Sequence, residues 1–308
     1  MSKNRWIIVA VLFTAMILVS FVGGPLGASI LDRDMMGMFD IGLHAPETLC
    51  GEEIFNLGGM PISNTMLASW LSMIVLIGLF YVAARKPKLV PSGLQSLVEF
   101  AMEWLQSFVN DMVGEKVGRQ IFPVVATIFF FVLANGWMGL LPIFGPIGQH
   151  TEEGFIPLLR GGNTDLNFPL SLAIISAILV ETWGFKTFGM PYLGKFFSFS
   201  NILGGMKEIF RGKVRPGIGR IINGVVDVFA GFIELISEIF RLISFTFRLF
   251  GNMFAGELLV MVALYLIPLI VVQLVYGLEF LFGFVQALIF AGLTTGFVAV
   301  AIASREHE

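Results

Sequence analysis

The hydrophobic pattern divides the chain into long apolar stretches separated by polar connections. The two longest apolar stretches lie near the C-terminus and run from Ile221 to Ile267 and from Val271 to Ala303. The earlier ones each meet or approach the roughly 20 apolar residues that a membrane-spanning helix needs. They cover residues 6–22, 66–84, 122–144 and 168–187. The pattern therefore predicts an all-α integral membrane protein with about five to six membrane helices.

The first apolar stretch has two interpretations. Lys3 and Arg5 precede it, and a basic start followed by a short apolar run is also typical of a secretory signal peptide. No clean small-x-small cleavage site precedes the polar loop that follows. We therefore favour a retained span and keep a cleaved signal peptide as the alternative.

The two C-terminal stretches are too long to stand upright in a bilayer. As helices they would measure roughly 70 and 50 Å, against a hydrocarbon core of about 30 Å. They are separated only by the turn around Pro268, so we expect a break or a strongly tilted helical hairpin. Small side chains along it allow close helix approach, either between these two helices or toward a second, curved membrane object. These are Gly251, Ala255, Gly283, Ala287, Ala291, Gly292, Thr295 and Gly296.

Basic residues are concentrated in two connections, which fixes the expected orientation. Lys and Arg accumulate on the cytoplasmic side of membrane proteins, so 85–119 and 186–220 are assigned inside. The mainly acidic loops 23–65 and 145–167 are assigned outside. Between Pro91 and Gly118, apolar residues recur at helical spacing, which predicts an interfacial amphipathic helix.

These features divide the chain into three regions. Residues 1–64 hold the first apolar segment and an outer loop, and 65–220 hold membrane helices with a basic inner connection. Residues 221–308 form the C-terminal hairpin.

Composition agrees with a membrane protein and narrows its chemistry. Of all residues, 56% are hydrophobic and 13% charged, whereas soluble proteins average about 25% charged. The net charge of −3 gives no reason to expect a nucleic-acid partner. The single cysteine, Cys50, excludes an internal disulfide and a cysteine-based metal site. We expect no cofactor, no bound metal and, since no G-x-x-x-x-G-K-[ST] loop occurs, no nucleotide binding by this chain.

Seven charged residues lie within the otherwise apolar hairpin. A charge near the centre of a bilayer costs at least about 2.5–3.5 kcal/mol, and such residues usually mark ion pathways, relays or counter-ions. Several of them follow each other by three or four positions and so form a polar stripe on one helix. The seven are Asp227, Glu234, Glu238, Arg241, Arg248, Glu257 and Glu279.

Arg248 is the most deeply placed cation. Guanidinium stays protonated at any physiological pH, so whatever faces Arg248 experiences a permanent positive charge. No acid lies three or four positions away, which favours a partner on another chain, with a structural pair to Glu279 as the alternative. Arg241 instead has Glu238 and Glu234 within reach on its own helix, so an ordinary ion pair explains it equally well.

The acids of the hairpin are candidate proton relays, because carboxyl groups in apolar surroundings can exchange protons near neutral pH. Glu234 lies toward the predicted inside of Arg248, and Glu257 and Glu279 lie toward the outside. This order suggests two proton paths that enter from opposite sides with a fixed cation between them.

The segment Ser244–Leu259, SFTFRLFGNMFAGELL, resembles the signature helix of the a-subunit family of rotary F-type ATP synthases. The resemblance extends to SGLQ…VE at 92–99, TDLN at 164–167 and the positions around Gln286, and covers roughly 80–304. It implies a proton-translocating stator subunit of the membrane sector. We expect a bacterial plasma membrane as its location, with a chloroplast membrane as the alternative. The implied partners are a c-ring, peripheral-stalk b subunits and the lipid bilayer.

The resemblance also implies roles for individual residues in two offset half-channels. Arg248 would face the proton-carrying carboxylate of the c-ring, with Asn252 and Gln286 flanking it. Glu234 and Ser237 would belong to the inner path, with Glu238 and Arg241 as secondary residues. Glu257, Glu279 and Asp165 would belong to the outer path.

The sequence departs from the family at one point. Family members often pair an acid with a histidine where this chain has Glu257 and Glu279. Two acids would share protons and titrate as a unit, so which one carries the proton stays open. Asp165 equally fits a simple loop cap.

Two other functions fit parts of the pattern. A sodium-translocating version of the same subunit would keep most of these residues. An unrelated secondary transporter would also place charges in the membrane, but it usually shows internal repeats and interrupted helices.

Overall fold

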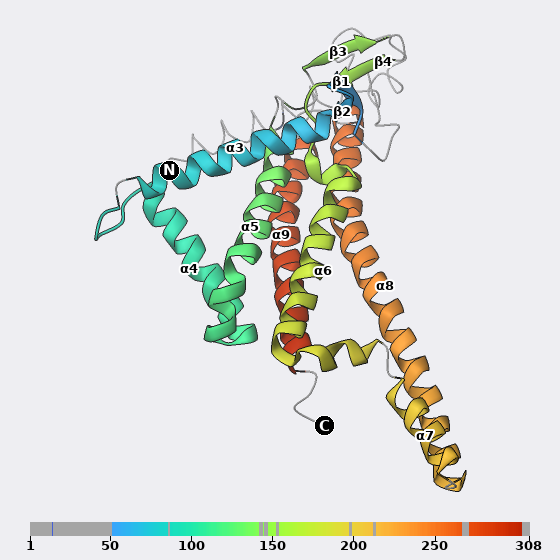
Figure 1. The fold of residues 1–308 in the computed structure, drawn as a ribbon. Helices are drawn as coiled ribbons and strands as arrows, with labels where there is room; N and C mark the ends of the chain where they lie inside the picture. The colour runs from blue at the N-terminus through green and yellow to red at the C-terminus, as the bar shows by residue number, and fades with distance from the viewer. Residues whose placement is uncertain are drawn as a thin grey trace. The chain divides into compact units, whose positions relative to one another are not determined.

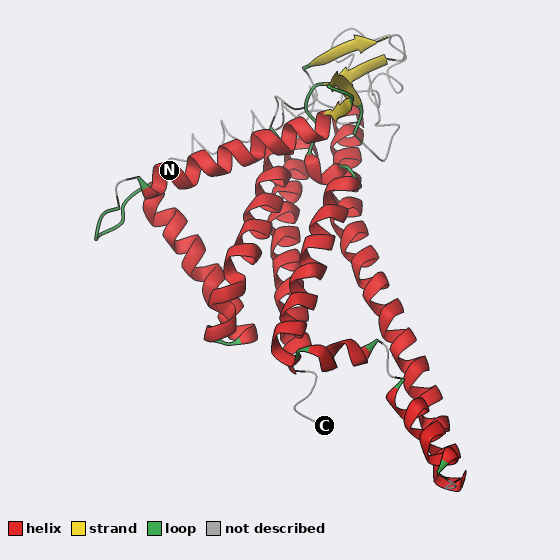
Figure 2. Ribbon diagram, viewed as in Figure 1, coloured by secondary structure: helices red, strands yellow, loops and turns green. Residues whose placement is uncertain are grey.

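The computed structural model describes Thr14 and residues 51–303, apart from 86, 142–143, 145–146, 152–153, 197–198, 212–213 and 267–270. The predicted span at 6–22 (except Thr14) and the turn around Pro268 lie outside the described residues. Helices make up most of what is described, as Figure 2 shows in red.

The helices match the predicted membrane architecture. Four of those described, α3, α5, α6 and α9, are long and apolar enough to cross a membrane, which confirms the all-α membrane class. Their bounds are α3 Asn64–Ala84, α4 Leu94–Val113, α5 Glu115–Gly139, α6 Asn167–Phe188, α7 Ser200–Phe210, α8 Val214–Leu266 and α9 Val271–Ala303, with short 3-10 turns η1 Gly162–Thr164 and η2 Met190–Lys195.

Two small β-hairpins interrupt the outer loops, and the sequence analysis did not predict them. Strand β1 (Glu53–Leu57) pairs with β2 (Met60–Ser63), and β3 (Gly148–Thr151) pairs with β4 (Gly154–Pro157). Gly58 and Gly59 turn the first hairpin with φ of 60° and 93°. A tight hairpin turn requires two successive residues in the left-handed region, so the Gly-Gly pair was the sequence signal for this turn.

Helix α8 is longer than expected, since it begins at Val214 rather than near residue 221. Pro216 falls in its first turn, where a missing backbone N–H breaks no helical hydrogen bond. Its 53 residues correspond to ~80 Å, well beyond the ~30 Å hydrocarbon core.

The chain forms two compact units, each of which takes residues from several helices. The first comprises residues 1–99, 127–168 and 248–289. In it, the end of α8 packs on the start of α9 through Ala263, Val272 and Val275. Polar groups hold α3, α5 and η1 together: Ser72 hydrogen-bonds Asn135 at 3.2 Å, and the Asn163 side chain donates to the Val132 carbonyl at 3.0 Å.

The second unit comprises residues 100–126, 169–247 and 290–308. Here α8 packs on α9 through aromatic side chains, since the Phe245 ring lies 4.7 Å from Phe290 and 5.6 Å from Phe297. Gly292 and Gly296 do not serve this packing. A Cβ at either glycine would meet Phe108 or Met112 of α4, so this G-x-x-x-G pair makes room for α4 side chains instead of for α8.

Helix α7 runs antiparallel along the beginning of α8, as Figure 1 shows. Gly205 of α7 approaches the backbone of Gly217 and Ile221, and Gly224 of α8 approaches Ile202. An ion pair between Arg220 and Glu208, 2.6 Å long, and a hydrogen bond from Asn201 to Asp227, also 2.6 Å, fasten the pair. Asp227, one of the seven hairpin charges, therefore has a local structural partner.

The close approach of α7 and α8 leads to a stability prediction. A Cβ at Gly205 would lie 2.7 Å from the Gly217 carbonyl oxygen, so Gly205→Ala should push the helices apart and destabilise the protein by about 1–3 kcal/mol. Thermal unfolding of the detergent-purified protein measures this. Gly219→Ala is the matched control, because nothing lies within 4 Å of that position and alanine favours a helix. Equal melting temperatures for the two variants would contradict the packing described.

Candidate functional site

Arg248 lies on an exposed face of α8. The exposed residues of this helix recur at helical spacing, and Asn252, one turn after Arg248, is also exposed. The space beside Gly251 is open as well. The chain thus leaves this face of α8 uncovered among the described residues. Other exposed members of the face are Phe240, Ser244, Phe247, Ala255, Leu259 and Val262.

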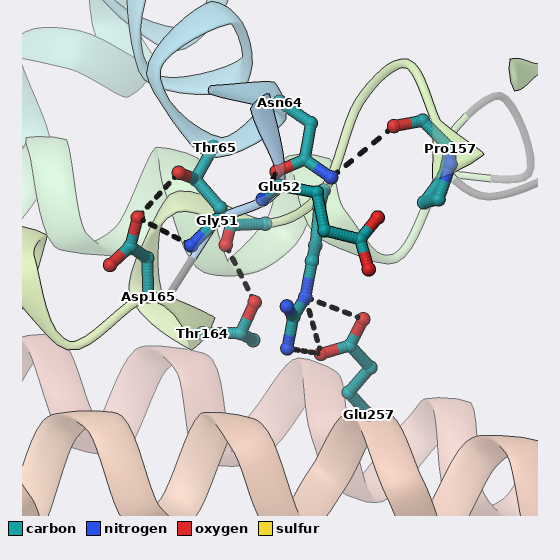
Figure 3. Close-up of polar contacts among 10 residues, drawn as sticks. Gly51, Glu52, Asn64, Thr65, Pro157, Thr164, Asp165 and Glu257 are labelled. Atoms are coloured by element: carbon teal, nitrogen blue, oxygen red, sulfur yellow. Dashed lines mark hydrogen bonds and ion pairs between the residues drawn. The ribbon is translucent and has the colours of Figure 1, made fainter. Parts of the chain in front are cut away.

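Glu257 has an arginine partner that the sequence analysis did not assign. Arg160 Nε donates to both carboxylate oxygens at 3.3 Å, and Nη2 donates to Oε2 at 3.2 Å (Figure 3). The Arg160 residue is only 4% exposed, and its guanidinium also lies over the Phe254 ring. Because 97 positions separate Arg160 from Glu257, no local pattern could have joined them.

Glu279 lies in different surroundings. It is buried on α9, and its carboxylate lies so close to Gly256 of α8 that a Cβ there would overlap it. It is not part of the Arg160–Glu257 ion pair. The two acids that the sequence groups together therefore have unlike partners.

Asp165 organises the backbone around it. Its Oδ2 accepts hydrogen bonds from Thr65 Oγ1 at 2.6 Å and the Gly51 backbone N–H at 3.1 Å (Figure 3). Its Oδ1 accepts from the Asn167 N–H at 2.9 Å. These bonds tie the start of α3 to the start of α6. They match the alternative interpretation of Asp165 as a loop cap.

Nearby, Asn64 connects the two β-hairpins. Its side chain accepts from the Glu52 N–H and donates to the Pro157 carbonyl (Figure 3).

Gln286, on α9, is buried at 7% exposure.

The second unit contains a cluster of ion pairs centred on Lys195 of η2. Lys195 Nζ lies 2.7 Å from Glu234 Oε1 and 3.1 Å from Glu238 Oε1. Glu238 also accepts from Arg241 at 2.7 Å, as the helical spacing indicated, and Arg241 covers the Phe297 ring. Ser237 is exposed and donates to the Ile233 carbonyl of its own helix.

Electrostatics keep Lys195 charged. Burial lowers its pKa, but hydrogen bonds to Glu234 and Glu238 outweigh burial, so the pKa lies above its ordinary value. Tyr192, in the same turn, remains a neutral phenol because burial raises its pKa to about 12.

Sequence reasoning missed three residues of these clusters. Arg160 and Lys195 were counted only as loop charges, since their partners are distant in sequence. Glu181 was overlooked although an available signal existed: it is an acid within the predicted span at 168–187. Within the described ranges, no group of three His, Cys, Asp or Glu residues could hold a metal ion.

Comparison with known proteins gives consistent matches. Residues 66–299 match the family described as ATP synthase A chain. ATP synthase subunit a of Gloeobacter violaceus is 30% identical over 286 residues, which cover 91% of this chain and 97% of that protein. ATP synthase subunit a of Moorella thermoacetica is 28% identical over 248 residues, covering 80% of this chain and 94% of that protein.

The Arg160–Glu257 pair leads to a second prediction. Arg160→Gln leaves the Glu257 carboxylate partly buried without its cation, so it should destabilise the protein by roughly 3–5 kcal/mol. The double variant Arg160→Gln/Glu257→Gln should recover most of this loss in thermal unfolding of the purified protein. Arg119→Gln is the control, because Arg119 and Glu115 form an exposed pair worth at most about 1 kcal/mol. A double variant as unstable as the single one would show that the pair is not coupled.

Proposed function

The chain belongs to the ATP synthase A chain family, and from this we propose that it conducts protons between the two sides of a bacterial plasma membrane and a rotating c-ring. As a member of that family it is a non-catalytic membrane subunit of the Fo sector, and catalysis occurs in F1. We further propose that peripheral-stalk b subunits hold it still against the ring.

One observation carries the proposal: Arg248 and Asn252 are exposed on a largely apolar face of α8. Guanidinium stays protonated at physiological pH, so Arg248 presents a permanent positive charge to whatever approaches this face. A carboxylate on a neighbouring rotor helix would be attracted to it. Gly251 and Ala255 on the same face would allow the rotor helix to approach closely.

The outer path delivers protons to the ring in this proposal. Arg160 binds the Glu257 carboxylate in an ion pair that a proton on Glu257 would weaken. That leaves Glu279, buried and without an ion pair among the described residues, as the group that binds and passes the proton. Asp165 supports this path by ordering the backbone at its outer end.

Arg248 makes the rotation of the ring directional in this mechanism. A rotor carboxyl that has taken a proton is neutral and can face lipid as the ring turns. When it reaches the inner path near Glu234 and Ser237 it releases the proton, and Arg248 stabilises the resulting carboxylate while it passes. A proton crossing directly from path to path would have to approach the fixed guanidinium, which repels it. The membrane potential drives the cycle with about 2.3 kcal/mol per charge per 100 mV.

Substitution of Arg248 tests the proposal. Arg248→Ala should leave the ATP synthase assembled but reduce ATP-driven acidification of inside-out membrane vesicles to background, because the rotor carboxylates lose their counter-ion. The assay is run without added sodium, so that wild-type acidification also separates proton from sodium transport. Arg220→Ala is the control, since Arg220 pairs with Glu208 away from this face. Pumping by an assembled Arg248→Ala complex would refute the mechanism.

The two outer acids should respond differently to neutralisation. Glu279→Gln removes the proton carrier with little change in shape, so pumping should fall by about tenfold or more while assembly is kept. Glu257→Gln leaves the buried Arg160 without its anion, so assembled complex should be lost instead. Pumping per assembled complex, quantified by immunoblotting of the purified membranes, separates the two effects. The opposite result, lost pumping in Glu257→Gln and lost assembly in Glu279→Gln, would identify Glu257 as the proton carrier.

A further inference from the structure

Three carboxyl groups and two cations meet in the cluster around Lys195. Glu181 comes from α6, Lys195 from η2, and Glu234, Glu238 and Arg241 from α8. Glu181 interacts electrostatically with Glu238, Lys195 and Arg241. With all groups ionised the cluster would carry one negative charge in excess. One carboxyl is therefore available to bind a proton, and a bound proton makes the cluster neutral.

The ion pairs indicate which carboxyl this is. Glu234 and Glu238 each lie within 3.1 Å of Lys195 Nζ, and Glu238 also pairs with Arg241. A carboxylate paired with a cation is held in its charged form. Glu181 has no ion pair among the described residues, and the Tyr192 hydroxyl lies near enough to act as its hydrogen-bond donor.

Glycines bring these groups together. Gly184 lies one turn after Glu181 on α6, and a Cβ there would overlap the Tyr192 ring, so only glycine lets Tyr192 pack at this place. Gly231 lies one turn before Glu234 on α8, and its Cβ would be 2.5 Å from the Phe196 carbonyl oxygen. The end of η2 therefore approaches both helices, and Lys195 can reach α8.

We infer that Glu181 is the carboxyl that takes up and releases the proton in the inner path, and that Lys195 is a positioning residue that holds Glu234 and Glu238 in ion pairs. This inference rests on the proposed function. In ATP synthesis the Glu181 carboxylate accepts a proton that a rotor carboxyl has released, and an O–H bond forms. Loss of that proton to water on the inner side regenerates the carboxylate, and no other bond changes.

The alternative within the same cluster is that Glu234 itself exchanges the proton. Lys195 argues against this, because its pKa is raised and it stays charged, so protonating Glu234 would break a 2.7 Å ion pair. Protonating Glu181 breaks no ion pair that the structure describes. Tyr192, neutral at physiological pH, and the Phe297 ring under Arg241 add no competing proton carrier.

The experiment measures proton conduction through the whole membrane sector. Inside-out vesicles carrying the assembled complex are stripped of F1, and a potassium diffusion potential drives protons from the medium into the lumen. The medium then bathes the inner path, so conduction is recorded as a function of its pH. Glu181→Gln should slow conduction by about tenfold and flatten its pH profile, because one titrating carboxyl is lost. Glu181→Asp, which keeps the carboxyl, should retain the pH dependence.

Lys195 is tested by the midpoint of the same profile. Lys195→Gln removes a cation that interacts with Glu181, so a proton binds the cluster more readily and the midpoint should rise by about one pH unit or more. Lys195→Arg keeps the charge and should restore the wild-type midpoint. Glu208→Gln, in the Arg220 ion pair on α7, is the matched control and should behave as the wild type.

Other outcomes overturn the inference. A Glu181→Gln profile that is slow but has the wild-type pH dependence would show a structural role only, and a wild-type rate would exclude any role. An unchanged midpoint in Lys195→Gln would remove the role given to Lys195. Arg248→Ala is assayed for ATP-driven pumping in the same membranes. If it pumps, the proposed function is wrong; if it does not pump while Glu181→Gln and Lys195→Gln behave as wild type, only the present inference is wrong.

Discussion

The structure depends on one electrostatic constraint, that a charge removed from water must be balanced nearby. The chain balances most charges of α8 itself. Asp227 receives a hydrogen bond from Asn201, Glu238 pairs with Lys195 and Arg241, and Glu257 pairs with Arg160. Arg248 lies on an exposed, largely apolar face of the same helix. In the proposed function, its guanidinium meets the carboxylates of another subunit as they pass.

Small residues decide where the polar groups can lie. Gly256 leaves room for the Glu279 carboxylate, Gly184 for the Tyr192 ring, and Gly231 for the backbone at Phe196. At each of these glycines, a group from another element occupies the space that a side chain of the helix would otherwise fill. The same residue type in α9, Gly292 and Gly296, serves apolar packing against α4. The role of a glycine in such a helix therefore depends on which group approaches it.

The two acidic clusters follow a common arrangement. In each, a cation from a connecting segment fixes acids of α8: Arg160 follows β4 and binds Glu257, and Lys195 ends η2 and binds Glu234 and Glu238. Each proposed path also includes a carboxyl on a different helix that has no ion pair in the described chain, Glu279 on α9 and Glu181 on α6. In the proposed mechanism these two carboxyls exchange protons.

The sequence by itself determined the membrane class and the long C-terminal helices, and it singled out Arg248 as a candidate, because apolar length and charge within an apolar stretch are local properties of the chain. It also gave the Arg241–Glu238 pair, which one helix turn dictates. Only the tertiary structure joined Arg160 to Glu257, Lys195 to Glu234 and Asp165 to Thr65, since 97, 39 and 100 positions separate these partners. Such pairs depend on how loops fold back onto helices, which periodicity does not encode. Thus the sequence identifies which charges need a partner, and the packing of the chain selects the partner.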